Sequence, residues 1–201
     1  MEFEQEFEHK FEILVIGTSL GGLNALKVIL AGLPKKLPLA VAIAQHRHKD
    51  SDGELVTFLQ QHSLLPVVEA EDKQAIVPGQ VYLAPADYHL LVEVDHFALS
   101  TEAPVSYARP SIDVLFESAA DAYREKVIGV ILTGSNHDGS QGLAKIKAYG
   151  GLTIVQEPDS AESRIMPDAA IAAVGTARIL PLPQIAPFLV NVCSSTYSRT
   201  C

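Results

Sequence analysis

The sequence predicts an α/β protein with a three-layer α/β/α arrangement: a doubly wound, mostly parallel sheet with an antiparallel hairpin at one edge. Three observations support this prediction. Short, continuous runs rich in Val and Ile are typical of strands buried on both faces of a parallel sheet. Segments with helical spacing alternate with these runs, which indicates repeated right-handed crossovers. In the middle of the chain, apolar runs are instead joined by tight polar turns, as in antiparallel strands.

The first predicted strand and helix are separated by a glycine-rich turn. A strand is expected over residues 11–16 and a helix over residues 22–31, which ends before Gly32 and Pro34. The next apolar run predicts a second strand over residues 39–44. This strand, helix and strand form the first parallel unit of the sheet.

Three short runs in the middle of the chain predict the antiparallel hairpin. Strands are expected over residues 81–84, 88–94 and 97–100, and short polar turns join them. Turns of this length connect antiparallel neighbours, because a parallel connection needs a crossover of about a dozen residues or more.

The second half of the chain returns to the alternating pattern. Pro110 favours the start of a helix, where proline is tolerated, and Gly150 with Gly151 ends another helix. Met166 and Pro167 indicate a packed turn that enters a further helix. The other predicted elements are a helix over residues 110–123, a strand over 127–132, a helix over 139–149, strands over 152–156 and 178–180, and a helix over 183–192.

Length and composition predict one folded domain. The chain has 201 residues, of which 48% are hydrophobic and 19% are charged, as expected for a globular protein rather than a disordered one. We expect an acidic tail over residues 1–10, a folded domain over 11–192 and a second tail over 193–201. The formal net charge of -9 would repel nucleic acid.

The sequence shows no targeting or metal-binding pattern. No basic segment followed by an apolar core marks a secretory signal, and no apolar run is long enough to span a bilayer. The two cysteines, Cys193 and Cys201, lie too close to the end of the chain to build a metal site or a disulfide framework. We therefore expect a cytoplasmic protein without membrane insertion or a bound metal.

Ser19 lies in the turn GTSLGG, directly after the first predicted strand. Three interpretations of this serine compete: it caps the following helix, it belongs to a glycine-rich loop that binds a dinucleotide, or it is a nucleophile. The spacing is not G-x-G-x-x-G, and no acidic residue ends the second strand to bind a ribose hydroxyl. The dinucleotide interpretation is therefore disfavoured.

Two further polar residues follow predicted strands. His46 comes after the second strand in the motif AQHRH, and Asp138 comes after the strand over residues 127–132 in the motif SNHDG. Taken singly, such a histidine is more often a buried, hydrogen-bonded ring, and such an aspartate a helix cap. Because the carboxyl ends of parallel strands meet at one edge of a sheet, we expect both residues near Ser19.

A serine, a histidine and an aspartate at one sheet edge are the residue types of a hydrolytic triad. The imidazole takes the proton of the serine, and the carboxylate fixes the tautomer of the imidazole. Triads are recognised by geometry, so the order of the three residues along the chain excludes nothing. Oxyanion donors would be backbone N–H groups of Leu20 or of the loop that contains Gly134 and Ser135.

In order and spacing, the motifs resemble those of the catalytic domain of the chemotaxis receptor methylesterase, the CheB family. The resemblance covers nearly the whole chain, from ILVIGTSLGG through AIAQHRH, VYLAPADYHLLV, RPSIDVLFESAA and VIGVILTGSNHDGSQGL to IMPDAAI. It implies that Ser19 is the nucleophile, His46 the general base and acid, and Asp138 the orienting carboxylate. It also implies that residues 11–192 form the catalytic domain.

The CheB family hydrolyses glutamate γ-methyl esters on the cytoplasmic helices of chemoreceptors, and some members deamidate receptor glutamines. The resemblance therefore implies a protein-glutamate methylesterase that needs no metal or organic cofactor and has a methylated chemoreceptor as its partner. Members usually carry a phosphorylated receiver domain ahead of the catalytic domain, whereas about ten residues precede it here. The resemblance thus implies an excised domain or a free-standing variant, with a receiver domain on another chain or missing.

The chain departs from the family pattern near the expected oxyanion site. Leu20 replaces a small hydroxyl residue, and Ser135 with Asn136 replaces a Met-Gly pair. One alternative is therefore a receptor-binding module with impaired catalysis, and another is an esterase or amidase that acts on a different substrate. Arg109 is a candidate contact for an acidic substrate surface, the alternative being a salt bridge or a carbonyl contact within the fold.

Overall fold

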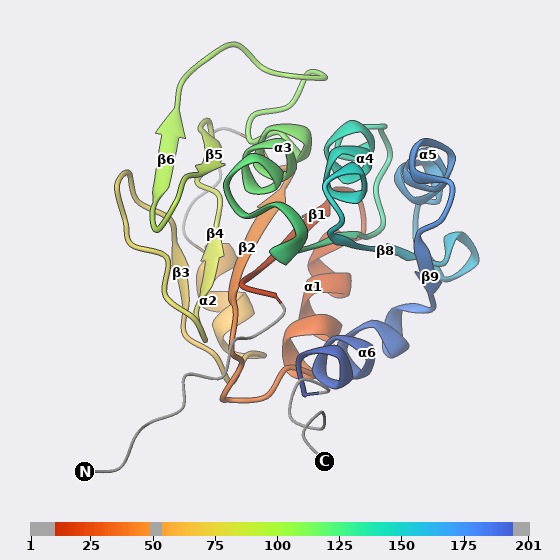
Figure 1. Ribbon diagram of the computed structural model, residues 1–201, viewed down its shortest axis with the longest axis horizontal. Helices are drawn as coiled ribbons and strands as arrows, with labels where there is room; N and C mark the ends of the chain where they lie inside the picture. Colours follow the sequence, from red (N-terminus) through yellow and green to blue (C-terminus); the bar gives the residue numbers. More distant parts are fainter. Residues whose placement is uncertain (1–10, 49–53, 195–201) are drawn as a thin grey trace.

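A computed structural model describes residues 11–48 and 54–194 of the chain (Figure 1). Seven strands form one sheet: β1 (Ile13–Thr18), β2 (Ala40–Gln45), β3 (Val67–Glu69), β4 (Val81–Leu83), β7 (Val127–Ile131), β8 (Leu152–Gln156) and β9 (Arg178–Leu180). Neighbouring strands run parallel, in the spatial order β3-β4-β2-β1-β7-β8-β9. The doubly wound, mostly parallel sheet predicted from the sequence is confirmed.

Helices cover both faces of this sheet (Figure 1). One face carries α1 (Gly22–Ala31), α2 (Glu54–Gln60) and α6 (Leu182–Ser194), and the other carries α3 (Ile112–Tyr123), α4 (Ser140–Ala148) and α5 (Ile165–Val174). Short 3-10 helices span Arg124–Lys126 and Pro158–Ser160. Successive residues of β1 point to opposite faces, so Leu14 packs in the core beside α1 and Val15 in the core beside α3. Burial on both faces explains why the strands are continuously apolar.

The predicted hairpin is present, but it forms a sheet of its own. Strands β5 (His89–Val92) and β6 (Phe97–Ser100) pair antiparallel, and the backbone N–H of Val92 donates to the Ser118 hydroxyl of α3 at 3.0 Å. The prediction that residues 81–84 belong to this hairpin is wrong. They include β4, which pairs in parallel with β2 and β3, and the short turn after it leads out of the main sheet rather than back along it.

The predicted bounds of an element agree best with the observed ones where glycines or polar turns end that element. Helix α1 and strands β8 and β9 have the predicted bounds, whereas α6 continues to Ser194. Helix α2 and strand β3 were not predicted, because seven and three residues are too few for a clear periodicity. Tails are expected over residues 1–10 and 193–201. Residues 193 and 194 belong to α6 instead, and the rest of both segments lies outside the described residues. Within the described part of the chain, no helix is both long enough and apolar enough to span a bilayer.

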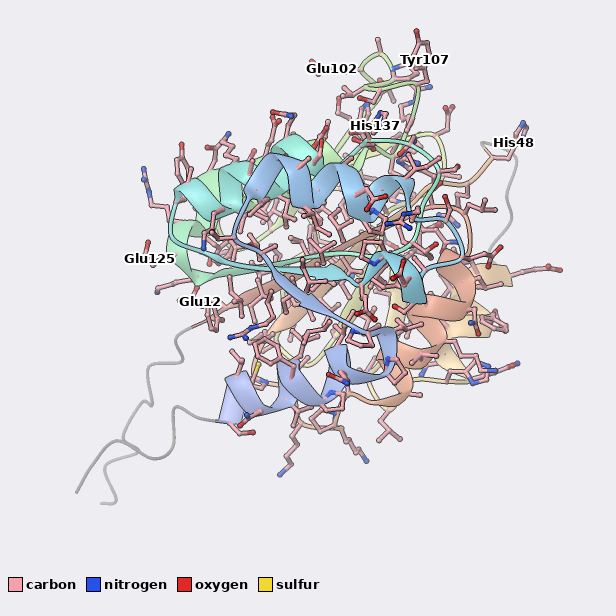
Figure 2. The ribbon with its side chains drawn as sticks, turned by 90° about the vertical axis from the view of Figure 1, so that its right-hand side faces the viewer. Glu12, His48, Glu102, Tyr107, Glu125 and His137 are labelled. Carbon is pink, nitrogen blue, oxygen red and sulfur yellow. The ribbon has the colours of Figure 1, made fainter. Side chains whose placement is uncertain are left out.

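The direction in which strands are added to the sheet reverses at β1. Strands β2 to β4 lie on one side of β1, and β7 to β9 lie on the other. Figure 2 shows Glu12 and Glu125, which precede β1 and β7, at one edge of the sheet, and His48 and His137, which follow β2 and β7, at the opposite edge. A switch point of this kind opens a crevice at the carboxyl ends of the strands, where ligands bind. Residues directly after β1, β2 and β7 therefore lie at this crevice.

Candidate active site

Ser19 follows β1, at the centre of the sheet edge. Its backbone N–H donates to the carbonyl of Thr133 at 3.0 Å, and the backbone N–H of His46 donates to the carbonyl of Thr18 at 3.1 Å. Since Thr18 is paired with Gln45, Ser19 and His46 are the next residues along two neighbouring strands. The Ser19 side chain is partly exposed, and its hydroxyl has no hydrogen-bond partner among the residues that the structure describes.

Ser19 is not the N-cap of α1, so that interpretation of the serine is wrong. The N-cap residue is Gly21, which has a left-handed backbone with φ of 79°, and no side chain accepts a hydrogen bond there. An added Cβ at Gly21 would lie 2.7 Å from Cβ of Glu162. Glycine at this position therefore lets the chain enter the helix sharply and leaves Ser19 outside it.

His46 and Asp138 are in direct contact. Nε2 of His46 lies 2.7 Å from Oδ2 of Asp138, and the side chain of Asp138 is fully buried whereas that of His46 is 13% exposed. The second ring nitrogen of His46, Nδ1, lies 3.1 Å from Nδ2 of Asn136. The structure thus brings the predicted base and carboxylate into contact. His46 follows β2 at the position that corresponds to Ser19 after the neighbouring strand β1.

Asp138 binds the N-terminus of a helix, but the helix is α3 rather than α4. Its carboxylate accepts hydrogen bonds from the Ser111 hydroxyl at 2.9 Å, the Ile112 N–H at 2.7 Å and the Asp113 N–H at 3.0 Å. The N-cap of α4 is Gly139, with no side-chain hydrogen bond. The free N–H groups and the dipole at the start of α3 therefore stabilise the negative charge of Asp138.

The pKa of Asp138 reflects two opposing effects. Burial alone would raise it, because a low-dielectric environment disfavours the charged carboxylate. Hydrogen bonds from His46, Ile112 and Asp113 outweigh burial and hold the pKa below its ordinary value. Asp138 is therefore ionised at neutral pH and able to hold the Nε2 proton of His46.

Two glycines let α3 approach the sheet closely enough for these contacts. A Cβ added at Gly17 would lie 2.2 Å from Cγ2 of Ile112, and one added at Gly139 would lie 2.5 Å from the same atom. Gly139 also has φ of 91°, a conformation that side chains disfavour. Ile112, the first residue of α3, thus packs over two positions without side chains, which brings the α3 N–H groups to Asp138.

The three predicted oxyanion residues differ in their backbone contacts. The Gly134 N–H donates to the carbonyl of Ser163 at 3.2 Å. The N–H groups of Leu20 and Ser135 have no hydrogen-bond partner within the described residues, and both residues are exposed. Leu20 and Ser135 therefore have donors available for a developing negative charge, whereas the Gly134 donor is already used.

The hydroxyl groups of Thr133 and Ser163 connect the loops at this edge of the sheet. Neither residue was predicted from the sequence to have this role. The Thr133 hydroxyl donates to the carbonyl of Leu20 at 2.9 Å and accepts from the Ser163 N–H at 2.9 Å. The Ser163 hydroxyl donates to the carbonyl of Gly134 at 2.9 Å. Thr133 directly follows a buried apolar run, which is a recognisable signal in the sequence. Ser163 has no comparable signal, because its partners lie about 30 residues earlier in the chain.

The guanidinium of Arg109 is engaged within the fold. Its Nη2 and Nε lie 2.6 and 3.0 Å from Oδ1 of Asp87, and its Nη1 donates to the carbonyls of Thr101 and Glu102 at 2.8 and 2.9 Å. These contacts hold the start of the loop between β6 and α3. The loop includes Glu102 and Tyr107, which Figure 2 shows close together at the top of the molecule. The contacts of Arg109 are thus a salt bridge and carbonyl contacts within the fold, which is the alternative given above. A contact between Arg109 and an acidic substrate surface stays a prediction.

Two further histidines at this edge, His48 and His137, are exposed (Figure 2). A metal site needs several His, Cys, Asp or Glu side chains that converge on one point. The described residues contain no group of three or more such side chains that could hold a metal ion.

Asp113 is a second buried carboxyl group beside Asp138. The pKa of Asp113 is raised to about 6. Burial is the main cause, a hydrogen bond of 2.8 Å from the Gly142 N–H acts in the opposite direction, and the negative charge of Asp138 adds to the rise. Because this pKa is higher in the folded chain than in the unfolded chain, the stability that it contributes is present below about pH 4. That stability is lost as the pH rises through about 6.

We therefore expect Asp113→Asn to raise the free energy of unfolding by about 2 to 3 kcal/mol at pH 8 and by less than about 1 kcal/mol at pH 4. The amide oxygen can still accept from Gly142, but no charge is buried. Urea unfolding at both pH values measures the difference. Asp121→Asn, at an exposed position of α3, is the control and should change stability by less than about 1 kcal/mol. A gain that is larger at pH 4 than at pH 8 would contradict the assignment.

Protein families and solved structures both include matches to this chain. Residues 14–189 match the family described as CheB methylesterase. The crystal structure of the Thermotoga maritima CheB methylesterase catalytic domain has the same fold, with a TM-score of 0.87 and 34% sequence identity. The match covers 90% of this chain and 98% of that one.

Curated relatives agree with this match. A Leptospira interrogans protein, whose name gives protein-glutamate methylesterase/protein-glutamine glutaminase as a provisional assignment, is 47% identical over 183 residues, which are 90% of this chain and 95% of that protein. A Thermotoga maritima protein with that name and a Pseudomonas aeruginosa protein with that name and the number 3 are 35% and 39% identical. The match covers 90% of this chain but 54% of each of those two proteins, about half their length. The chain belongs to the CheB methylesterase family.

Proposed function

We propose that this protein is a protein-glutamate methylesterase that hydrolyses glutamate γ-methyl esters on the cytoplasmic helices of chemoreceptors. The observation that carries the proposal is the hydrogen bond between His46 and the ionised Asp138, beside the partly exposed Ser19 at the switch point of the sheet. The names of the relatives support the same activity. In this proposal residues 11–192 are the catalytic domain, and the reaction takes place in the cytoplasm.

The first half of the reaction forms an acyl-enzyme. Asp138 keeps one proton of His46 on Nε2, so Nδ1 carries the lone pair. Nδ1 takes the proton of Ser19 while the serine oxygen bonds to the ester carbonyl carbon, and an electron pair moves to the carbonyl oxygen. The free N–H groups of Leu20 and Ser135 are the proposed donors to that oxygen.

The second half releases both products. The tetrahedral intermediate collapses, the bond between the acyl carbon and the methoxy oxygen breaks, and methanol leaves with the proton from Nδ1 of His46. A water molecule then gives a proton to the same nitrogen and attacks the acyl carbon. When this second tetrahedral intermediate collapses, the bond between the acyl carbon and the serine oxygen breaks, Nδ1 returns the proton to Ser19, and a glutamate carboxylate is left. A glutamine side chain would follow the same steps with ammonia as the first product, which is the proposed glutaminase activity.

The proposal predicts that the purified protein releases methanol from a receptor cytoplasmic fragment that carries labelled methyl esters. Volatile label measures the release, and the same fragment without methyl esters is the control. Binding of the methylated fragment by folded protein without release would support the receptor-binding alternative. Hydrolysis of small esters without hydrolysis of the receptor fragment would indicate a different substrate.

A further inference from the structure

The side-chain amide of Asn136 contacts both His46 and Asp138. Its Nδ2 lies 3.1 Å from Nδ1 of His46, and its Oδ1 accepts a hydrogen bond of 3.2 Å from the backbone N–H of Asp138. A backbone N–H is only a donor, so the amide oxygen must face Asp138 and the NH₂ group must face His46. Nδ1 of His46 is therefore the acceptor in its contact with Asn136.

These contacts decide which nitrogen of His46 carries the proton. Nε2 faces the carboxylate of Asp138, which is only an acceptor when ionised. Asp138 and Asn136 thus both require the tautomer with its proton on Nε2 and its lone pair on Nδ1. In that tautomer, Nδ1 is the only ring nitrogen that can take a proton from Ser19. Asn136 already occupies it.

We propose that Asn136 is a positioning residue that binds the base nitrogen of His46 in the resting site and must release it before Ser19 can be deprotonated. This inference rests on the function proposed above. The Ser19 hydroxyl has no hydrogen-bond partner in the described part of the chain, as expected when the base is bound to another group. After release, the Ser19 O–H donates to Nδ1, and the proton moves to Nδ1 as the serine oxygen bonds to the carbonyl carbon.

The surroundings of Asn136 permit this release. Asn136 is partly exposed, and its chain neighbours Ser135 and His137 are exposed. A change of side-chain rotamer at Asn136 would free Nδ1 without disturbing the four hydrogen bonds of the Asp138 carboxylate.

The test measures the rate at which a fluorophosphonate modifies Ser19, which requires an activated serine but no receptor. In Asn136→Ala the base nitrogen is free, so we expect modification about threefold to tenfold faster, the equivalent of one hydrogen bond. In Asn136→Asp a carboxylate oxygen faces Nδ1, and the ring binds a second proton that removes the lone pair. We expect modification to be slower by about 10²-fold or more. Asn24→Ala, at an exposed position of α1, should modify at the wild-type rate.

A purely structural role for Asn136 predicts the opposite order. Aspartate keeps the oxygen that accepts from the Asp138 N–H and would then preserve the rate, whereas alanine loses it and would lower the rate. The two variants therefore separate the two roles, provided that urea unfolding shows both to be folded. Folded Asn136→Ala that modifies no faster than wild type, including the case in which neither is modified, would overturn the proposal.

A spectroscopic measurement gives a second, independent readout. In ¹⁵N spectra of the wild-type protein we expect the His46 ring to be protonated on Nε2, and in Asn136→Ala we expect the same tautomer with a changed Nδ1 signal. An unchanged Nδ1 signal in that variant would contradict the contact. Wild-type protein that reacts with the fluorophosphonate but releases no methanol would refute the methylesterase function while leaving the role of Asn136 measurable.

Discussion

Replacing Ser19 with alanine is expected to lower methanol release from a methylated receptor fragment by about 10⁴-fold or more, because no other group in the proposed mechanism can form the acyl-enzyme. The residual rate would come from substrate binding and oxyanion donors alone. The rate of labelled methanol release by wild type and variant at equal concentration measures the effect.

The same substitution is expected to leave stability nearly unchanged. The Ser19 hydroxyl is partly exposed and has no hydrogen-bond partner among the described residues, so its loss should change the free energy of unfolding by less than about 0.5 kcal/mol. Urea unfolding of both proteins provides the control. Equal methanol release by wild type and Ser19→Ala would refute the assignment of the nucleophile.

Replacing Asp138 with alanine is expected to damage both activity and stability. Methanol release should fall by about 10⁴-fold, because His46 loses the carboxylate that holds its tautomer. The free energy of unfolding should fall by about 3 kcal/mol, since Ser111, Ile112 and Asp113 lose the acceptor for their buried donors. Methanol release and urea unfolding measure the two effects separately.

The loss of stability should depend on pH in a defined direction. The pKa of Asp138 is lower in the folded chain than in the unfolded one, so its contribution is present above about pH 4 and is lost as the pH falls through the folded value. The difference in stability between wild type and Asp138→Ala should therefore shrink in acid. Asp121→Ala, which removes an exposed carboxylate of α3 paired with Lys145, should cost less than about 1 kcal/mol and no activity. An Asp138→Ala protein as stable as wild type at pH 7 would contradict the capping role.

Much of the fold follows from local patterns in the sequence. Continuous apolar runs marked β1, β2 and β7, since a strand covered by helices on both sides has no polar face. Strand β4 was placed in the wrong sheet because its residues, Val81–Leu83, are as apolar as those of a hairpin strand. Only its neighbours in space, β2 and β3, distinguish the two cases, and pairing partners are not encoded in local periodicity.

The candidate site could be predicted in part for the same reason. The topology of a parallel sheet places Ser19, His46 and Asp138 at one edge, whatever the details of the loops. The capping of α3 by Asp138 was not predictable, because it depends on how closely Ile112 packs against the sheet. In the sequence, Asn136 is recognisable only as a departure from the family pattern, because its role depends on the side-chain orientation of His46.

Peptide mapping of the fluorophosphonate-treated protein shows whether Ser19 is the nucleophile. We expect mass spectrometry to find the phosphonate on the peptide that contains Ser19. We also expect methanol release to fall in proportion to the fraction of Ser19 that is modified. His46→Ala should block the modification while the protein remains folded. Modification of a different hydroxyl, or undiminished methanol release from protein fully modified at Ser19, would show that Ser19 is not the nucleophile.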